Sequence, residues 1–355
     1  MSDDKAQGHE PAVQPRFRDP LAMPSLAGFV AATGAQRAAA LIKPDGRFDY
    51  RTQDGESLGG YNLLRHCGTA WSIVDIAGQL GGLDQQVAAA ARAMGWLVKR
   101  RIEPLNGGLC IASNGAAKLG GAGLGMLALT ALARVGDRDQ HLTTAEGLAR
   151  FALSLQREDG DFHHKVATGT GDVLDFHSDY YTGEALFGLV QVYRATLDEQ
   201  YLTPVIRAIQ ALDRLDYGVK EQSHWMSYAI VALHAVTEET WLVDYAGRII
   251  RNILDRPVYR RRRRSAPTAC RVEAFMTYGD MLHRTGGETT GPRWDEVMEN
   301  AALDLVALIG LRLPDGGFIG GYDDPAVQID YIQHSASAFV GFHRNAMRAA
   351  SGLNG

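Results

Sequence analysis

Hydrophobic residues recur along most of this chain with the three- to four-residue spacing of α-helices. The predicted helices alternate between two kinds. Helices of the first kind carry charge along one face, as in DQQVAAAARAMGWLVKR, whereas helices of the second kind are rich in Gly, Ala and Ser, as in AKLGGAGLGMLALTALARVG. A helix that is apolar or small nearly all round is buried on most sides, so the second kind belongs to the interior.

Six pairs of helices are predicted, each with one member of either kind. The amphipathic members are expected at 28–42, 84–100, 139–156, 199–215, 239–254 and 292–312. The buried members are expected at 61–80, 117–135, 178–197, 222–236, 267–286 and 327–349. The segment 101–116 breaks the helical pattern, and its Asn106-Gly107 predicts a short β-hairpin.

The motif Asp-Gly-x-Phe occurs three times, each time after an amphipathic helix. It occupies 45–48, 159–162 and 315–318. Asp-Gly forms a tight turn because glycine accepts positive φ and aspartate hydrogen-bonds its own backbone, and the Phe then anchors the turn on the core. A turn that recurs at one point of a two-helix unit indicates a repeat architecture.

Six such pairs predict an all-α fold, the (α/α)6 toroid, in which the buried helices form an inner barrel and the amphipathic helices an outer layer. An open solenoid is the alternative, but it needs polar capping repeats at both ends. The last buried helix, IDYIQHSASAFVGFHRNAM, is no more polar than the middle ones, which favours a closed ring. We expect 21–355 to form this single domain after a disordered leader at 1–20.

Composition narrows the class of protein. A hydrophobic content of 46% with 22% charged residues is typical of a soluble globular protein with a large core. The net charge of −5 argues against nucleic acid as a partner, and no apolar run is long enough for a membrane span. The polar N-terminus lacks the apolar segment of a signal peptide, and three scattered cysteines do not suggest disulfides, so we expect a cytoplasmic protein.

Chemically active residue types concentrate where the buried helices begin. In a closed ring these helices run the same way, so their N-termini meet at one mouth of the barrel. We expect substrate to be bound there by Tyr61, Arg65, Tyr180, Glu184, His224, Trp225, Arg271, Tyr331 and His334. Structural roles are the alternative, since the histidines could belong to the core and a buried Glu184 needs a partner such as Arg65 or Arg271.

The candidate catalytic residues at this mouth are Asp179, Glu273, Asp330 and His66. Glycoside hydrolysis needs two carboxyl groups, one protonated acid and one base or nucleophile. Polysaccharide lyases and uronate epimerases instead need a Tyr or His base and a cation that neutralises a substrate carboxylate. The residue types present allow both chemistries.

The sequence contains no nucleotide-binding fingerprint and no His-x-x-x-His or Cys-x-x-Cys pair, so no cofactor and no metal are expected. The arginine run 260–264 precedes the fifth buried helix, and together with Arg65 and Arg271 it would attract an anionic oligosaccharide or polysaccharide. The alternative is that Arg65 and Arg271 neutralise Glu184 and Glu273 internally.

With these turns and hairpins, the chain from about 28 to 350 resembles the six-hairpin glycosidase-like superfamily, notably in YNLLRHCGTAW, DYYTGEALFGLVQVY and QIDYIQHSASA. The resemblance implies a carbohydrate-active enzyme, with hydrolysis of glycosidic bonds favoured over lyase or epimerase activity. The Asp-Gly-x-Phe turns also look like the repeats of terpene cyclases and prenyltransferase β-subunits. Because the Asp-x-Asp-Asp acid and the zinc ligands of those enzymes are missing, an isoprenoid enzyme is the second reading. A non-catalytic protein that binds polysaccharide or lipid is the third.

Overall fold

The computed structural model describes residues 22–352, and the expected leader at 1–20 lies outside them. The outer helices are α1 (Ala22–Ala40), α3 (Asp84–Arg101), α5 (Arg138–Ser154), α7 (Glu199–Asp213), α9 (Trp241–Asp255) and α12 (Trp294–Ile309). The inner helices are α2 (Leu63–Leu80), α4 (Leu119–Leu132), α6 (Tyr181–Thr196), α8 (His224–Thr237), α11 (Ser265–Arg284) and α13 (Ile329–Gly352). A short helix, α10 (Val258–Arg262), was not predicted and contains part of the arginine run.

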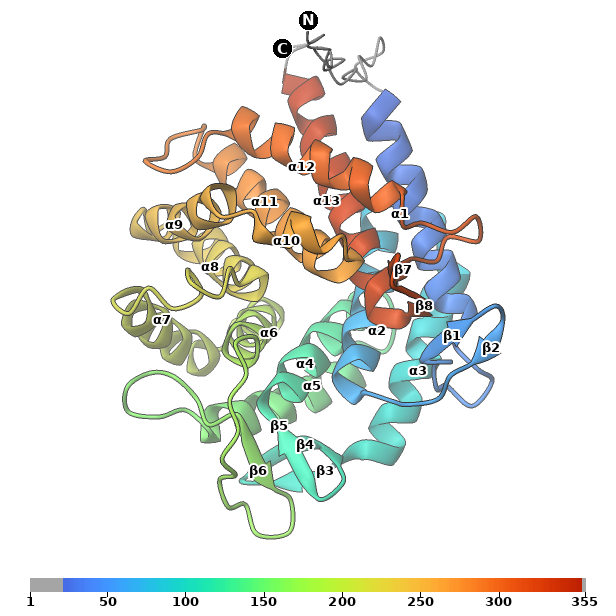
Figure 1. Cartoon of the computed structure of the whole chain (residues 1–355). Coiled ribbons are helices and arrows are strands. Elements are labelled where there is room, and N and C mark those ends of the chain that lie inside the picture. The colour runs from blue at the N-terminus through green and yellow to red at the C-terminus, as the bar shows by residue number, and fades with distance from the viewer. Residues whose placement is uncertain (1–21, 353–355) are drawn as a thin grey trace, which may run out of the picture.

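The inner helices form a closed ring (Figure 1). Each packs against the next in the order α2, α4, α6, α8, α11 and α13, and α13 packs back against α2. The last contact includes a hydrogen bond of 2.9 Å between the hydroxyl groups of Ser72 and Ser337. The (α/α)6 toroid is therefore confirmed, and the open solenoid is wrong.

The three Asp-Gly-x-Phe turns share one geometry. Gly46, Gly160 and Gly316 have φ of 92°, 90° and 90°, and the aspartate before each accepts a hydrogen bond from the backbone N–H two residues on. The following Phe is at most 2% exposed in every copy. Each turn lies against the next outer helix of the ring, where a Cβ on the glycine would meet α3, α7 or α1 within 3.0 Å. The motif therefore joins neighbouring hairpins of the outer layer.

Small residues let the inner helices approach one another closely. A Cβ on Gly123 of α4 would lie 2.5 Å from the carbonyl oxygen of Glu184 in α6. A Cβ on Gly183 would lie 2.7 Å from the backbone nitrogen of Met226 in α8. The glycine-rich composition of the inner helices is thus a packing requirement.

The predicted β-hairpin at 101–116 is confirmed as β3 (Ile102–Leu105) and β4 (Gly108–Ser113), with Asn106 and Gly107 at φ of 51° and 74°. It continues through β5 (Ala116–Lys118) and β6 (Lys165–Ala167) into one sheet. A second sheet has the order β2 (Glu56–Ser57), β1 (Arg51–Gln53), β8 (Asp324–Gln328) and β7 (Ile319–Gly321). Neither sheet was predicted beyond the hairpin, because strands of two to five residues carry almost no periodicity.

The pairing of β1 with β8 joins the first hairpin of the ring to the last, next to the start of α13.

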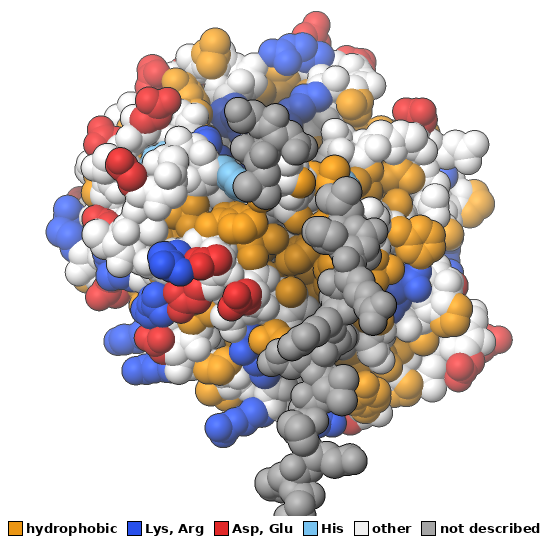
Figure 2. Space-filling model, turned by 90° about the horizontal axis from the view of Figure 1, so that it is seen from above, with side chains coloured by type: hydrophobic (Ala, Val, Ile, Leu, Met, Phe, Trp, Pro, Cys, Tyr) orange, Lys and Arg blue, Asp and Glu red, His pale blue; other side chains and the backbone are white. Residues whose placement is uncertain are grey.

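No helix in the described part of the chain is both long and apolar enough to cross a membrane. Figure 2 shows hydrophobic side chains among scattered charges on the side where α1, α12 and α13 lie, and exposed Phe29 and Leu303 belong to these helices.

Candidate active site

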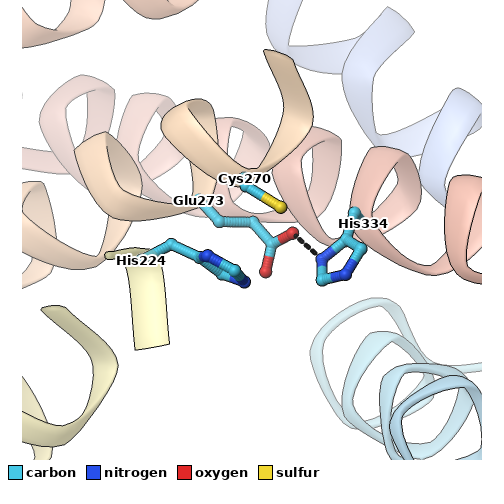
Figure 3. A group of neighbouring side chains, drawn as sticks. All are labelled: His224, Cys270, Glu273 and His334. Carbon is cyan, nitrogen blue, oxygen red and sulfur yellow. Dashed lines mark hydrogen bonds and ion pairs between the residues drawn. The ribbon is translucent and has the colours of Figure 1, made fainter. Parts of the chain in front are cut away.

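Four side chains from three inner helices converge near the N-terminal mouth, the end of the barrel where the inner helices begin (Figure 3). They are His224 from the start of α8, Cys270 and Glu273 from α11, and His334 from α13. One donor atom from each lies within 4.8 Å of the other three. Cys270 and Glu273 are three residues apart on a helix and therefore share a face.

His334 is held by a chain of hydrogen bonds. Its Nδ1 lies 2.8 Å from Oε1 of Glu273, and the hydroxyl of Tyr228 donates to Oε2 of the same carboxylate at 2.9 Å. The Glu273 side chain is fully buried, whereas that of His334 remains 13% exposed. Burial alone would lower the pKa of His334, but Cys270 and the Glu273 carboxylate beside it raise this pKa well above its usual value. The surroundings of His334 therefore favour its protonated form.

His224 has the opposite environment. It is 2% exposed, and neither ring nitrogen has a hydrogen-bond partner in the described chain. Its ring stands edge-on to that of His334, with centroids 5.2 Å apart. Burial, together with nearby His334 and Arg271, lowers the pKa of His224 well below its usual value. The surroundings thus favour the neutral form of His224 and the protonated form of His334.

The same four groups could hold a divalent metal, since two imidazoles, a thiol and a carboxylate are the donors that zinc prefers. Such a metal would have to replace the hydrogen bond between His334 and Glu273, because both of its atoms are among the donors. No metal was expected from the sequence, because the members of this donor set come from three helices and form no short-range motif.

Arg65 and Asp330 form an ion pair at the same mouth. Nε of Arg65 lies 3.0 Å from Oδ2 of Asp330, and Gln328 donates to Oδ1 of Asp330 at 2.6 Å. The side chain of Asp330 is 7% exposed and that of Arg65 is 42% exposed. Next to them, Tyr331 donates to Asp324 at 3.0 Å. Asp330 is thus committed to internal partners, while the Arg65 side chain remains accessible.

Glu184 does not have the partner that was expected. Neither Arg65 nor Arg271 pairs with it, and its buried Oε2 has no hydrogen-bond partner among the described residues. The carboxyl group fits against Gly120 of α4, where a Cβ would overlap it. Burial raises the pKa of Glu184 to about 8, with His334 opposing the shift, so the group is mostly protonated at pH 7.

The other expected residues on α6 and α8 divide by exposure. Asp179 lies just before α6 with its side chain 57% exposed, close to His177. Tyr180 is 45% exposed, and its ring lies 6.3 Å from that of His224. Trp225 is 3% exposed and packs beside His224 and His334. Tyr180 is therefore accessible to a ligand, whereas the buried Trp225 packs against the two imidazoles.

His66 and Tyr61 have structural contacts and do not point toward the histidine pair. The fully buried ring of His66 lies 3.0 Å through Nε2 from the carbonyl of Ala93 in α3, so Nε2 donates. Its Nδ1 then accepts from the Tyr61 hydroxyl at 2.8 Å, and that hydroxyl accepts from the N–H of Phe48. Burial lowers the pKa of His66 to about 4. We therefore leave His66 and Tyr61 out of the proposed site.

The arginines expected at this mouth divide into paired and unpaired ones. Arg260 binds the buried Asp304, and Arg264 binds Asp323. Arg271 has no acidic partner in residues 22–352; it lies 3.4 Å from Oε1 of Gln222. The exposed residues 261–263 of the arginine run form no ion pair in the described chain either. The expected cationic concentration is thus neutralised only in part, by acids that the sequence analysis did not connect with it.

Cys270 and Tyr228 belong to the site but were not among its expected residues. Cys270 directly precedes the expected Arg271, and Tyr228 follows His224 by four residues, on the same helix face. That spacing was the available signal. Their roles depend on contacts with Glu273 and His334, which lie on other helices.

No family model matches the chain, and no curated protein matches it in sequence. Several solved structures match it in fold. A D-mannose isomerase has a TM-score of 0.71 at 12% identity, over 92% of this chain and 99% of the other. The cellobiose 2-epimerase from Bacillus thermoamylovorans B4167 has a TM-score of 0.71 at 15% identity, over 91% and 100%. An unsaturated glucuronyl hydrolase specific for heparin has a TM-score of 0.63 at 12% identity, over 93% and 98%. The chain therefore shares the fold of these carbohydrate-processing enzymes, the (α/α)6 toroid, as its hairpins and turns predicted.

Proposed function

We propose that this protein is a carbohydrate-active enzyme that moves a proton on the carbon next to a sugar carbonyl, as an epimerase or isomerase. The observation that carries the proposal is the pair formed by His224 and His334. Their ring centroids are 5.2 Å apart, and their surroundings shift their pKa values in opposite directions. Neighbouring groups whose environments separate their pKa values in this way are suited to act as base and acid.

In this proposal the open-chain sugar presents its carbonyl oxygen to His334. His224 takes the proton from the adjacent carbon, the electron pair of that bond forms the carbon–carbon double bond of an enediol, and His334 protonates the carbonyl oxygen. Return of a proton to the first carbon from the other face, with loss of the proton on the former carbonyl oxygen to His334, inverts that carbon. Return of a proton to the former carbonyl carbon, with loss of the hydroxyl proton on the first carbon, yields the isomer. Glu273 stabilises the protonated form of His334 before this transfer and after the proton returns.

The substrate class follows from what surrounds the pair. Tyr180 offers an exposed aromatic face and Arg65 an accessible guanidinium, both suited to a polar ring. Two proteins of similar fold are a D-mannose isomerase and a cellobiose 2-epimerase, which supports a reducing mono- or disaccharide. Because Arg65, Arg260 and Arg264 have acidic partners, we propose a neutral sugar in place of the anionic one inferred from the sequence.

Hydrolysis of a glycosidic bond is the second candidate, and Glu184 is the observation that favours it. A buried carboxyl with a pKa of about 8 has the protonation state of a general acid at neutral pH. The second carboxylate is harder to supply, since Glu273 and Asp330 are both held by internal hydrogen bonds. For this reason we rank hydrolysis below proton transfer.

The test is incubation with D-mannose, D-glucose, D-fructose and cellobiose in D2O, followed by NMR spectroscopy. We expect deuterium to appear at the carbon next to the carbonyl, together with an epimer or keto isomer, and both to be lost in His224→Asn. A matched control is His283→Asn, which changes an exposed histidine of α11. Cleavage of oligosaccharides, α-mannan or unsaturated glucuronides without exchange would overturn the proposal in favour of hydrolysis.

A further inference from the structure

A cavity of about 490 Å³ opens at the other end of the barrel. It is enclosed by the C-terminal halves of all the inner helices, from Trp71 in α2 to Arg344 in α13. Its volume lies within the range of small-molecule sites, about 300–1,000 Å³. We call it the C-terminal cavity.

An aromatic layer forms the floor of this cavity. Trp71, Phe187 and Tyr228 line it, and the rings of Phe187 and Tyr228 are stacked with centroids 5.1 Å apart. On its far side Tyr228 donates its hydroxyl to Glu273. The layer therefore separates the cavity from the histidine pair and offers a flat apolar surface to a ligand.

Four arginines line the cavity, against two aspartates, Asp75 and Asp280. The arginines come from the ends of different inner helices and are Arg134, Arg194, Arg284 and Arg344. Asp280 is shared, because it binds Arg344 at 3.0 Å and also Arg348 at 2.8 Å. The lining thus carries an excess of positive charge on a protein whose net charge is −5.

Three of these arginines have no acidic partner in residues 22–352. Arg134 donates to the side-chain oxygen of Gln191 at 3.2 Å, Arg284 donates to the carbonyl of Val231 at 3.1 Å, and Arg194 makes no hydrogen bond there. Partial burial and the neighbouring Arg134 lower the pKa of Arg194. Partial burial and Arg348, Arg194 and Arg344 also lower that of Arg284, despite the opposing effect of Asp280. Arg134, Arg194 and Arg284 are also exposed to solvent, so their charges are accessible to an anion.

Interaction with the helix C-termini is the alternative reason for arginines at this end, because the last carbonyls of a helix attract cations. Val231, the partner of Arg284, lies inside α8 and before its last turn, so this contact is not of that kind. Attraction to the helix ends also does not account for a cavity of this size with an aromatic floor, nor for the nearness of Arg194 to Arg134. A ligand that brings negative charge would account for all three.

We propose that the C-terminal cavity binds a small phosphate monoester, with the phosphate between Arg134, Arg194 and Arg284 and its organic part against the aromatic floor. A doubly charged phosphate matches the excess of two cations over the acids that line the cavity. Guanidinium groups bind phosphate oxygens through paired N–H donors, which favours arginine over lysine at such a site. This site is separate from the proposed reaction, and its test requires no turnover.

The experiment is titration of the full chain with phenyl phosphate by calorimetry at low salt, with inorganic phosphate and phenol as the partial probes. We expect phenyl phosphate to bind more tightly than either, and Arg194→Gln and Arg284→Gln each to weaken it at least about tenfold. The matched control is Arg348→Gln, at the same end of the barrel but outside the cavity lining, which should change the affinity less than about twofold.

Thermal denaturation of the free variants checks that each is folded. Absence of phenyl phosphate binding to the unmodified protein would overturn the proposal, and so would equal losses in Arg194→Gln and Arg348→Gln. Phosphate bound as tightly as phenyl phosphate would overturn the role of the aromatic floor. None of these outcomes bears on proton exchange at His224 and His334, so the two proposals fail independently.

Discussion

The two ends of the inner barrel differ in whether their charged side chains have partners of opposite charge. At the N-terminal mouth, the charged groups around the histidine pair are largely paired, as in Arg65 with Asp330 and His334 with Glu273, although Arg271 has no acidic partner among the described residues. At the C-terminal cavity, Arg134, Arg194 and Arg284 have no acidic partner among the described residues. Matched charges tune the pKa values of their neighbours, whereas unmatched charges attract a ligand, so the two ends suit reaction and anion binding respectively.

The largest expected effect is on the rate of proton exchange, which variants at the N-terminal mouth should lower and a variant at the C-terminal end should not. His224→Asn and His334→Asn should each reduce exchange of the sugar proton by about 10²–10⁴-fold, because each removes a group that transfers a proton. Arg348→Gln, at the C-terminal end, should leave the exchange rate unchanged within about twofold. The measurement is the rate of deuterium incorporation by NMR. Similar rates in His224→Asn and the unmodified protein would remove the histidine pair from the reaction.

The pH dependence of stability tests the buried acid at the N-terminal mouth. The pKa of Glu184 rises from its ordinary value of 4.5 to about 8 on burial, so the folded protein retains a proton that the unfolded chain releases between these values. The free energy of unfolding should therefore fall as pH rises from 4.5 to 8, by a few kcal/mol for a shift of this size.

Glu184→Gln carries a neutral amide at every pH and should lose this dependence. Urea unfolding of both proteins at intervals between pH 5 and 9 measures it. Parallel stability curves for the two proteins would show that Glu184 is ionised in the folded state, and would remove the observation that favours hydrolysis.

Packing density is the next contrast between the ends. Gly120 lies against the Glu184 carboxyl and the Tyr181 ring, so Gly120→Ala should destabilise the fold by about 1–3 kcal/mol through overpacking. Gly78 lines the C-terminal cavity with nothing within 4 Å of an added Cβ, so Gly78→Ala should be neutral or stabilise α2 by up to about 1 kcal/mol. Chemical denaturation compares them, and equal effects would contradict the tight N-terminal packing.

The smallest expected effect concerns Cys270. If the histidine pair works through its hydrogen-bonded arrangement, Cys270→Ser should change the exchange rate by less than about tenfold, because serine keeps a polar group beside His334. Metal analysis of the purified protein accompanies this variant. One zinc per chain, lost together with activity in Cys270→Ser, would recast these four residues as a metal centre.

The fold was largely predictable because it depends on local periodicity. The alternation of charged helices with glycine- and alanine-rich ones predicted the inner and outer layers, and the Asp-Gly-x-Phe turns predicted the repeat. Closure was also predicted from the last inner helix, α13, whose buried apolar residues include Ile329, Ile332 and Phe339. The pairing of β1 with β8 was not predictable, because these strands are too short to carry a pattern of alternating residues.

The sequence by itself also determined which residues stand where the inner helices begin, and so gathered most of the site. Only the tertiary structure decided their partners. Arg65 could equally have met Glu184 as Asp330, and His66 could have faced the barrel as His334 does; what separates them is the helix that each one packs against. Ion pairs and pKa shifts depend on distances of a few ångströms between helices far apart in the chain, and no local pattern encodes those distances.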